Sequence, residues 1–366
     1  MKKLLLLSFT VIASLSVSLA QPTIYTADIN PGAMGGVNVF LGPTALVDAI
    51  AAAVDDDIIH VVRSSLNYGT ITIDKRLNIF GIGLNPDTDG SQRSSVVTIN
   101  IADPLASGTR ISGLRTTTLN LGGTAGTLSD LLIENSYIRY IQHIDVTTLL
   151  TNIIIRNNVL GSSSGGTNDE VIDLLAGAMS NIIIANNVIY RVNTIDQGTI
   201  NADNGTSVEN NLFIGHSNAS RQRYWAFEVF NGNTVKNNIF FRLRPTGLTS
   251  LNGNTFENNL SFDTNGVDGF STVNGNISTN NLTGVDPLLA NVAGSLNIDF
   301  AFFNPTLDVL SPAIGAGEDG TDMGVFGGPA PMKLSGTLIP LIQSLTLPSM
   351  VLKGTDLPVQ IKAEGN

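Results

Sequence analysis

The chain has 366 residues, with 30 Asp and Glu against 19 Lys and Arg, and it contains no cysteine. The negative charge argues against nucleic acid as a partner, and an acidic polysaccharide would be repelled over most of the surface unless a basic groove or a bound cation reversed the local potential. The lack of cysteine excludes a disulfide framework, which a chain of this length can do without. Its 37 glycines and low charged fraction favour many short strands joined by turns.

The first twenty residues are typical of a secretory signal peptide. Lys2 and Lys3 precede an apolar run over 4–17, and residues 18–20, Ser-Leu-Ala, form a small-x-small cleavage site. We therefore expect a secreted or cell-surface protein that begins at Gln21, with 17 basic residues against 30 acidic ones and a formal charge of −13. A retained membrane anchor is the alternative, although no later segment has the roughly 18 consecutive apolar residues of a spanning helix.

Only one helix is predicted, near the start of the mature chain. After an N-terminal extension over 21–43, the segment 44–54 has a helix-forming composition, and Thr44 can cap its first turn. The acidic run 55–57 lies at the end of the helix where negative charge is unfavourable, so we interpret it as a turn. This turn leads into a predicted strand over 58–62.

The strongest signal is an internal repeat in which a short apolar strand leads into Asn-Asn, or into Asn-Ser in the first of seven copies. The copies are 21 to 29 residues apart, a period that indicates a stacked solenoid with two or three strands per coil. Stacking places equivalent residues about 4.8 Å apart, so one asparagine of each pair can bond the amide in the next coil and form an asparagine ladder. The sequence leaves open which asparagine points inward. The leading residues are Asn135, Asn157, Asn186, Asn210, Asn237, Asn258 and Asn280.

The residue before each pair supports the same alignment of coils. It would place Glu134 beside Arg156, and Lys236 between Glu209 and Glu257. Opposite charges on neighbouring strands stabilise a sheet by about 0.2–1 kcal/mol per pair. We interpret these charges as a solvated outer face rather than as catalytic groups.

A second repeat, Asn-Gly-Asn, precedes three of the pairs. Its copies occupy 231–233, 252–254 and 274–276. Glycine permits the positive φ of a tight corner, so we expect each copy to turn the chain between two strands.

The segments on either side of the repeats complete a pattern known from other proteins. The helix over 44–54 is followed by DIIHVV at 57–62 and GTITIDKRLNIFG at 69–81, and the repeats are followed by DPLL at 286–289, SPAIGAG at 311–317 and DMGVFG at 322–327. Over about 44–328 the chain thus resembles secreted bacterial members of the right-handed parallel β-helix superfamily, often called pectate-lyase-like. The resemblance implies an all-β fold, a right-handed parallel β-helix solenoid with an N-terminal capping helix.

This resemblance leaves the activity open, because the fold hosts lyases, hydrolases, esterases, adhesins and inert surface proteins. Its lyase members hold Ca²⁺ in a carboxylate cluster beside a Lys or Arg base, and its glycosidase members need carboxylates on adjacent strands. Neither set of motifs is found in this chain. The best acidic cluster is Asp169, Glu170 and Asp173, which we interpret as part of a solvated loop rather than a calcium site. We therefore assign no catalytic residue, cofactor or metal.

A binding site is predicted around residues 216–228, which hold the only Trp and two arginines of an acidic protein. Aromatic rings and guanidinium groups could provide a stacking platform and donors for a sugar or a carboxylate. The alternative is a tryptophan that faces the core, with arginines that keep only their charged ends in water. A second arginine pair follows the first by 21 residues, one coil on, and would widen the patch. The predicted binding residues are Arg221, Arg223, Tyr224, Trp225, Arg242 and Arg244.

Five prolines divide the last segment, residues 329–366, into short stretches. Prolines at this spacing limit strands to short or edge positions. We interpret the segment as a short C-terminal β cap of two or three strands over the open end of the solenoid, or alternatively as an anchoring or export segment.

Two functions remain from different classes. The first is a non-catalytic extracellular protein, expected to be monomeric, that contacts a polysaccharide or a cell-surface glycan through a long solenoid face. The second is a polysaccharide lyase or glycoside hydrolase with an unrecognised site. The missing catalytic motifs favour the first.

Overall fold

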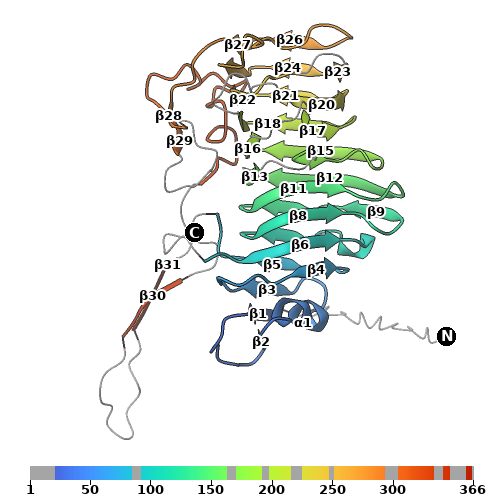
Figure 1. Ribbon diagram of the computed structural model, residues 1–366, viewed down its shortest axis with the longest axis vertical. Helices are drawn as coiled ribbons and strands as arrows, with labels where there is room; N and C mark the ends of the chain where they lie inside the picture. The colour runs from blue at the N-terminus through green and yellow to red at the C-terminus, as the bar shows by residue number, and fades with distance from the viewer. Residues whose placement is uncertain are drawn as a thin grey trace, which may run out of the picture.

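The computed structural model describes residues 21–84, 92–162, 170–191, 198–215, 225–246, 251–292, 304–333, 341–346 and 360–364. They form a right-handed parallel β-helix whose coils stack along the long axis, from α1 (Ala45–Ala52) and β1 (Ile24–Asp28) at one end to β26 (Ile277–Thr279) and β27 (Leu282–Thr283) at the other (Figure 1). The predicted signal peptide over 1–20 lies outside the described residues. Within them, no helix is long and apolar enough to cross a membrane.

One long sheet runs the whole length of the solenoid. Thirteen strands belong to it, and all neighbours along its path pair in parallel, as expected for successive coils. A short strand, β9 (Gly126–Ser129), adds to the beginning of β12 beside the main path. In spatial order the path contains β2 (Val39–Leu41), β1, β3 (Ile58–Val61), β5 (Asn78–Phe80), β7 (Arg110–Ser112), β10 (Leu132–Glu134), β12 (Thr148–Arg156), β15 (Met179–Ala185), β18 (Thr206–Glu209), β21 (Thr234–Lys236), β24 (Thr255–Glu257) and β26.

The second sheet branches at β11 (Tyr137–His143). It begins with β4 (Thr70–Ile73), β6 (Ser95–Ile101) and β8 (Arg115–Leu121). The beginning of β11 then pairs with one arm: β13 (Val159–Ser162), β16 (Val188–Arg191), β19 (Leu212–Ile214), β22 (Ile239–Phe241), β25 (Leu260–Phe262) and β27. Its end pairs with the other arm: β14 (Ile172–Asp173), β17 (Gly198–Ala202), β20 (Trp225–Asn231) and β23 (Leu251–Asn252). The later coils therefore carry three strands where the earlier coils carry two.

The N-terminal end follows the prediction closely. Helix α1 occupies Ala45–Ala52 and buries Leu46 and Ile50 against the first coil. Thr44 stands at the N-cap, but its hydroxyl donates to the Asp48 carboxylate at 2.7 Å instead of capping the backbone. After the helix, the Asp57 carboxylate accepts the backbone N–H of Val54 at 2.8 Å, which closes the expected turn before β3.

Alternate residues of each strand point inward and stack in columns along the solenoid. One column contains Ile133, Ile155, Ile184, Val208, Val235 and Phe256. In the later coils the inward residues become aromatic, and the rings of Phe213 and Phe240 stack with centroids 4.6 Å apart. Burying a side chain of this size contributes about 1.5–3 kcal/mol, so these columns supply much of the driving force for folding.

The two asparagines of each repeated pair point in different directions. The second one points inward, and its side-chain oxygen accepts the backbone N–H and the amide of the equivalent asparagine one coil earlier, at 2.8–3.1 Å. The leading asparagine has a φ of 50° to 58°, in the left-handed region that asparagine tolerates better than most residues. The inward residues form a continuous asparagine row: Asn158, Asn187, Asn211, Asn238, Asn259 and Asn281.

The Asn-Gly-Asn repeat turns the chain as the sequence predicts. Gly232, Gly253 and Gly275 have φ values of 66°, 64° and 75°, each at a corner between two strands. The asparagine after each glycine is buried, and Asn233 and Asn254 form a second row of hydrogen bonds that ends at Asn276. Each repeat therefore specifies one corner of the coil.

Residues 304–333, here called the C-terminal strap, run back over the outside of the solenoid. Their first strand, β29 (Asn304–Leu307), pairs in antiparallel fashion with β28 (Leu289–Asn291). Buried strap residues such as Met323 and Val325 pack on outward apolar side chains of β13, β16, β19 and β22. The motifs at 311–317 and 322–327 belong to this strap.

The leading asparagines hold the strap in place. The amide of Asn186 donates to the carbonyls of Val325 and Gly327 at 3.1 and 2.8 Å. The Asn237 side-chain oxygen accepts the N–H of Glu318 at 2.8 Å. The side-chain amides of Asn210 and Asn258 donate to strap carbonyls, as that of Asn186 does.

Beyond the strap, β30 (Leu341–Thr346) and β31 (Gln360–Glu364) pair with each other in antiparallel fashion. In Figure 1 this pair lies at the lower left, away from β26 and β27. The first residues of the predicted 329–366 segment belong to the strap instead. Its role as a cap or as an anchor stays a prediction.

Candidate functional site

The predicted binding patch falls partly outside the described residues. Arg221, Arg223 and Tyr224 lie there. Trp225 is the first residue of β20, where it is half-buried and pairs with Gly198 of β17. An isolated parallel bridge joins Trp225 to Arg244, so this arginine lies one coil from the tryptophan. The 21-residue offset between the two arginine pairs starts from residues outside the described ranges and stays a prediction.

Arg242 lies on the other side of a corner from Arg244. It follows β22 directly and has a φ of 61°. Its Nε donates to the carboxylate of Asp263, which lies one coil later, at 3.0 Å. Its guanidinium lies 4.5 Å from the centroid of the Phe241 ring. The residue between the two arginines, Leu243, is fully buried in the core.

A pocket of about 310 Å³ opens beside Arg242. The rings of Phe241 and Phe262, from successive coils, form one wall with centroids 6.3 Å apart. The segment 286–292 forms the opposite wall, where the Asp286 carboxylate accepts the N–H of Leu288 at 2.8 Å. Of the residues around this site, sequence analysis found only Arg242, because 286–289 matched the closing motif of the fold.

The residues of this Arg242 pocket suit binding better than catalysis. Aromatic rings and a guanidinium can contact the apolar face and the hydroxyls of a sugar. Among the described residues that line the pocket, only Asp286 has a carboxylate, whereas glycosidases need two. Arg242 is paired with the Asp263 carboxylate and lies over the Phe241 ring, so its guanidinium is held in a binding arrangement.

The predicted acidic cluster also lies partly outside the described residues. Asp169 lies outside the described residues, and Asp173 stands in β14 between Gln142 and Asn201 of the neighbouring coils. Glu228, on β20, accepts the N–H of Gly198 at 2.8 Å. Across the described ranges, no group of three or more His, Asp or Glu side chains could hold a metal ion.

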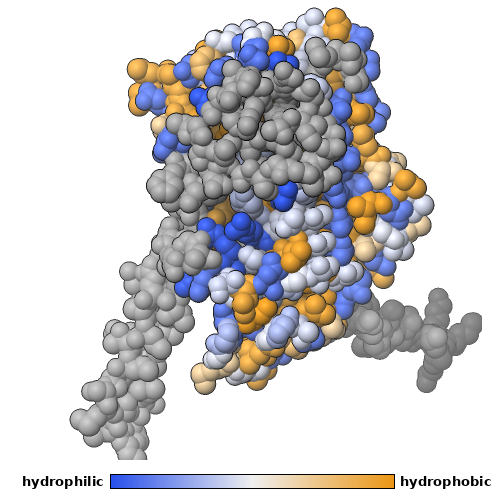
Figure 2. Space-filling view, in the orientation of Figure 1, coloured by the Kyte–Doolittle hydropathy of each residue, from blue (hydrophilic) through white to orange (hydrophobic). Residues whose placement is uncertain are grey.

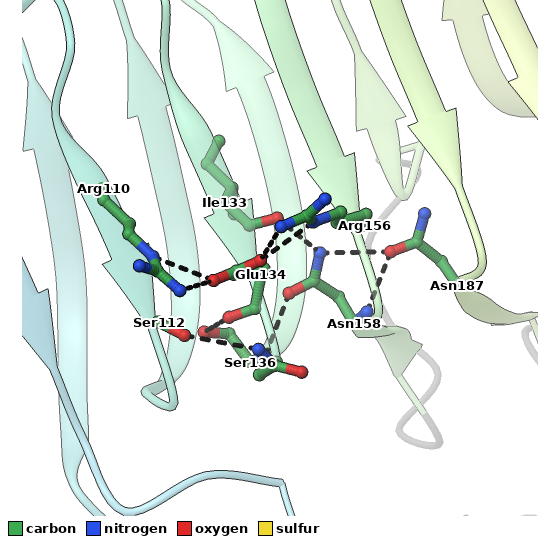
Figure 3. A network of polar contacts seen from close by, with 9 residues as sticks. Arg110, Ser112, Ile133, Glu134, Ser136, Arg156, Asn158 and Asn187 are labelled. Carbon is green, nitrogen blue, oxygen red and sulfur yellow. Dashed lines mark hydrogen bonds and ion pairs between the residues drawn. The ribbon is translucent and has the colours of Figure 1, made fainter. Parts of the chain in front are cut away.

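Figure 3 shows a charged network on the outer face of the long sheet. The expected pairing of Glu134 with Arg156 is confirmed, with Nε–Oε2 at 2.9 Å, and Arg110 binds the other carboxylate oxygen, with Nε–Oε1 at 2.8 Å. Glu134 is only 2% exposed, so its interpretation as a solvated charge was wrong. Two arginines that cover one carboxylate explain the burial, since each oxygen keeps a charged donor.

Lys236 also takes its predicted place between Glu209 and Glu257. Its Nζ lies 3.8 Å from the Glu209 carboxylate and 3.2 Å from that of Glu318 in the strap. Desolvation lowers the pKa of Lys236, but the charge of Glu209 and the hydrogen bond to Glu318 outweigh this and raise it above its usual value. The lysine therefore helps to fasten the strap.

No family model and no curated protein matches the sequence. Among solved structures, one titled "Structure of PL6 family alginate lyase AlyGC" is similar at 19% identity and a TM-score of 0.33, over 71% of this chain and 38% of that one. The chain thus spans about two fifths of that structure's length.

Proposed function

We propose that this chain is a secreted or cell-surface member of the pectate-lyase-like β-helix superfamily that binds glycans without transforming them. The Arg242 pocket is the proposed sugar site. The observation that carries this proposal is the pair of aromatic rings, Phe241 and Phe262, beside a guanidinium that Asp263 holds in place.

This arrangement lowers the cost of binding. An arginine free in solution would lose about 0.5–1.5 kcal/mol of side-chain entropy when a ligand orders it. Here the ion pair with Asp263 and the stacking on Phe241 order Arg242 beforehand. Its remaining N–H donors and the Asp286 carboxylate suit sugar hydroxyls, while the rings suit the C–H face of the sugar.

The location follows from the sequence. The signal-like segment over 1–20 supports export, and a glycan outside the cell is then the partner that the pocket would meet. Trp225 and Arg244, with Arg221, Arg223 and Tyr224, are proposed as a second contact for the same chain of sugars.

The test uses purified residues 21–366 and a panel of neutral and acidic glycans. Arg242→Ala and Phe262→Ala are each expected to weaken binding of the best ligand by about tenfold, the loss of one charge-assisted hydrogen bond or one ring contact. Arg76→Ala is the matched control, because Arg76 makes a similar ion pair with Asp56 at the far end of the solenoid. Equal affinity in all variants would refute the site.

The same panel separates binding from catalysis. Each glycan is incubated with the protein, with and without Ca²⁺, and assayed for new unsaturated and reducing ends. A lyase or hydrolase would produce them. A glycan that binds and stays intact supports the proposal.

A further inference from the structure

The outer face of the solenoid is apolar where the strap covers it and becomes cationic and aromatic beyond the strap. From Val159 through Val188 and Leu212 to Ile239, the residues in register are apolar and buried under the strap. One and two coils earlier, the same positions are occupied by Tyr137 and Arg115. The side chains change from apolar to cationic and aromatic where the buried column ends.

Two arginines lie against aromatic rings at this place. The guanidinium of Arg115 is 5.2 Å from the centroid of the Tyr137 ring, and that of Arg139 is 4.8 Å from the centroid of Tyr140. We call these four residues the arginine–tyrosine surface. In the lower middle of the face shown in Figure 2, at the level of β5, β6 and β8 in Figure 1, hydrophilic residues gather.

Both arginines influence the same pair of tyrosine hydroxyls. The hydroxyls of Tyr137 and Tyr190 hydrogen-bond to each other. Burial raises the pKa of Tyr190, whereas the charges of Arg115 and Arg139 both lower it. The geometry agrees: Arg115 stacks on the Tyr137 ring that it faces in register, and Arg139 follows Tyr137 by two residues on β11.

These charges are not neutralised in the part of the chain that the structure describes. Arg76, Arg110, Arg156 and Arg242 each form an ion pair there, but Arg115 and Arg139 form none. Acidic residues far outnumber basic ones in this chain, so two adjacent uncompensated arginines are unusual. Arg139 is half-buried, which strengthens its attraction to an anion, whereas Arg115 is exposed and accessible to one.

We propose that the arginine–tyrosine surface binds a sulfate or phosphate ester group carried by a glycan. Guanidinium groups match such oxyanions geometrically. A sulfate or phosphate ester presents three terminal oxygens, one more than a carboxylate, to the two guanidinium groups and the Tyr137 hydroxyl. The site rests on the proposed function in taking the ligand to be a glycan, but it uses a different surface from the Arg242 pocket.

The test measures binding of residues 21–366 to immobilised dextran in four forms: sulfated, phosphorylated, carboxymethylated and unmodified. We expect binding to the sulfated or the phosphorylated form, and the stronger of the two identifies the ester. In Arg115→Gln/Arg139→Gln this affinity should fall by about tenfold or more, since each lost contact is a charge-assisted one. Arg76→Gln, at an exposed ion pair elsewhere, should change nothing.

Two further comparisons keep the outcome clear. Arg115→Gln alone changes an exposed side chain, so a loss of binding in this variant with an unchanged unfolding midpoint cannot come from misfolding. Arg242→Ala is scored only on the unesterified glycan panel, so a failure of the Arg242 pocket appears there, whereas a failure of this surface appears as retained binding of esterified dextran by Arg115→Gln/Arg139→Gln. Preference for the carboxymethylated form, equal binding to unmodified dextran, or full affinity in the double variant would each overturn the proposal.

Discussion

Replacing Asn238 by alanine tests the asparagine row at its centre. Asn238 is fully buried; its amide donates to the carbonyls of Val208 and Lys236 at 2.8 and 2.9 Å, and its oxygen accepts the N–H of Asn211 at 2.8 Å. Alanine would leave at least one backbone N–H and one carbonyl buried without a partner. Each such group costs about 1–3 kcal/mol, so we expect the free energy of unfolding to fall by about 3–5 kcal/mol with the cavity included.

The matched control is Asn280→Gly. Asn280 leads the last pair, is exposed and has a φ of 53°, which glycine adopts without strain. We expect a change within about 0.5 kcal/mol. Urea unfolding followed by circular dichroism gives both values from the shift in midpoint at constant slope. If Asn238→Ala were as mild as the control, the row would not stabilise the stack and the reasoning would be refuted.

Three other results are expected. Glu134→Ala should lower the free energy of unfolding by about 2–3 kcal/mol in the same urea assay, because it leaves two arginines side by side without their carboxylate. An unchanged free energy of unfolding would contradict this. Val325→Asp should place a charge beneath the strap and speed amide hydrogen exchange of the strap by about tenfold or more, with exchange in the core columns unchanged; equal protection of the strap would argue that it is held elsewhere. The pKa of Lys236 is raised in the folded state, so the stability that this lysine contributes is fully present below the unfolded-state pKa of 10.5 and is lost as the pH rises above it. The thermal midpoint should therefore fall more steeply above that pH in the wild type than in Lys236→Met. Parallel curves would show that the lysine does not fasten the strap.

The stacking of coils could be predicted because it repeats. Each copy combines a strand of alternating apolar residues with a polar corner, so the spacing gives the coil length and the charges before each pair give the register. Glu134 beside Arg156 and Lys236 beside Glu209 follow from that register alone. The burial of Glu134 could not be predicted from the register. Its opposite residue in the preceding coil is Ser112, and the arginine that covers it, Arg110, lies two residues before Ser112.

The strap and the branch at β11 could not be predicted in this way. Neither repeats, and each depends on contacts between segments far apart in the sequence. The same limit applies to the Arg242 pocket, whose second wall over 286–292 is brought to Phe241 and Phe262 by tertiary packing. Arg242 itself was predicted as a binding residue because it follows Arg221 by 21 residues, and its ion pair with Asp263 spans the same 21 residues.

The repeated pair has two asparagines because its two positions face two different requirements. The inward position must satisfy buried backbone groups in two neighbouring coils, which needs a side chain that both donates and accepts. The leading position must adopt a left-handed φ, and in the later coils its outward amide also binds the strap at Asn186, Asn210, Asn237 and Asn258. In the earliest copy the inward residue is Ser136, which still accepts and donates at that end of the row. The outward asparagines thus anchor the strap along the apolar column that ends at Tyr137, and this leaves Arg115 and Arg139 beyond it as the place where an anionic partner can bind.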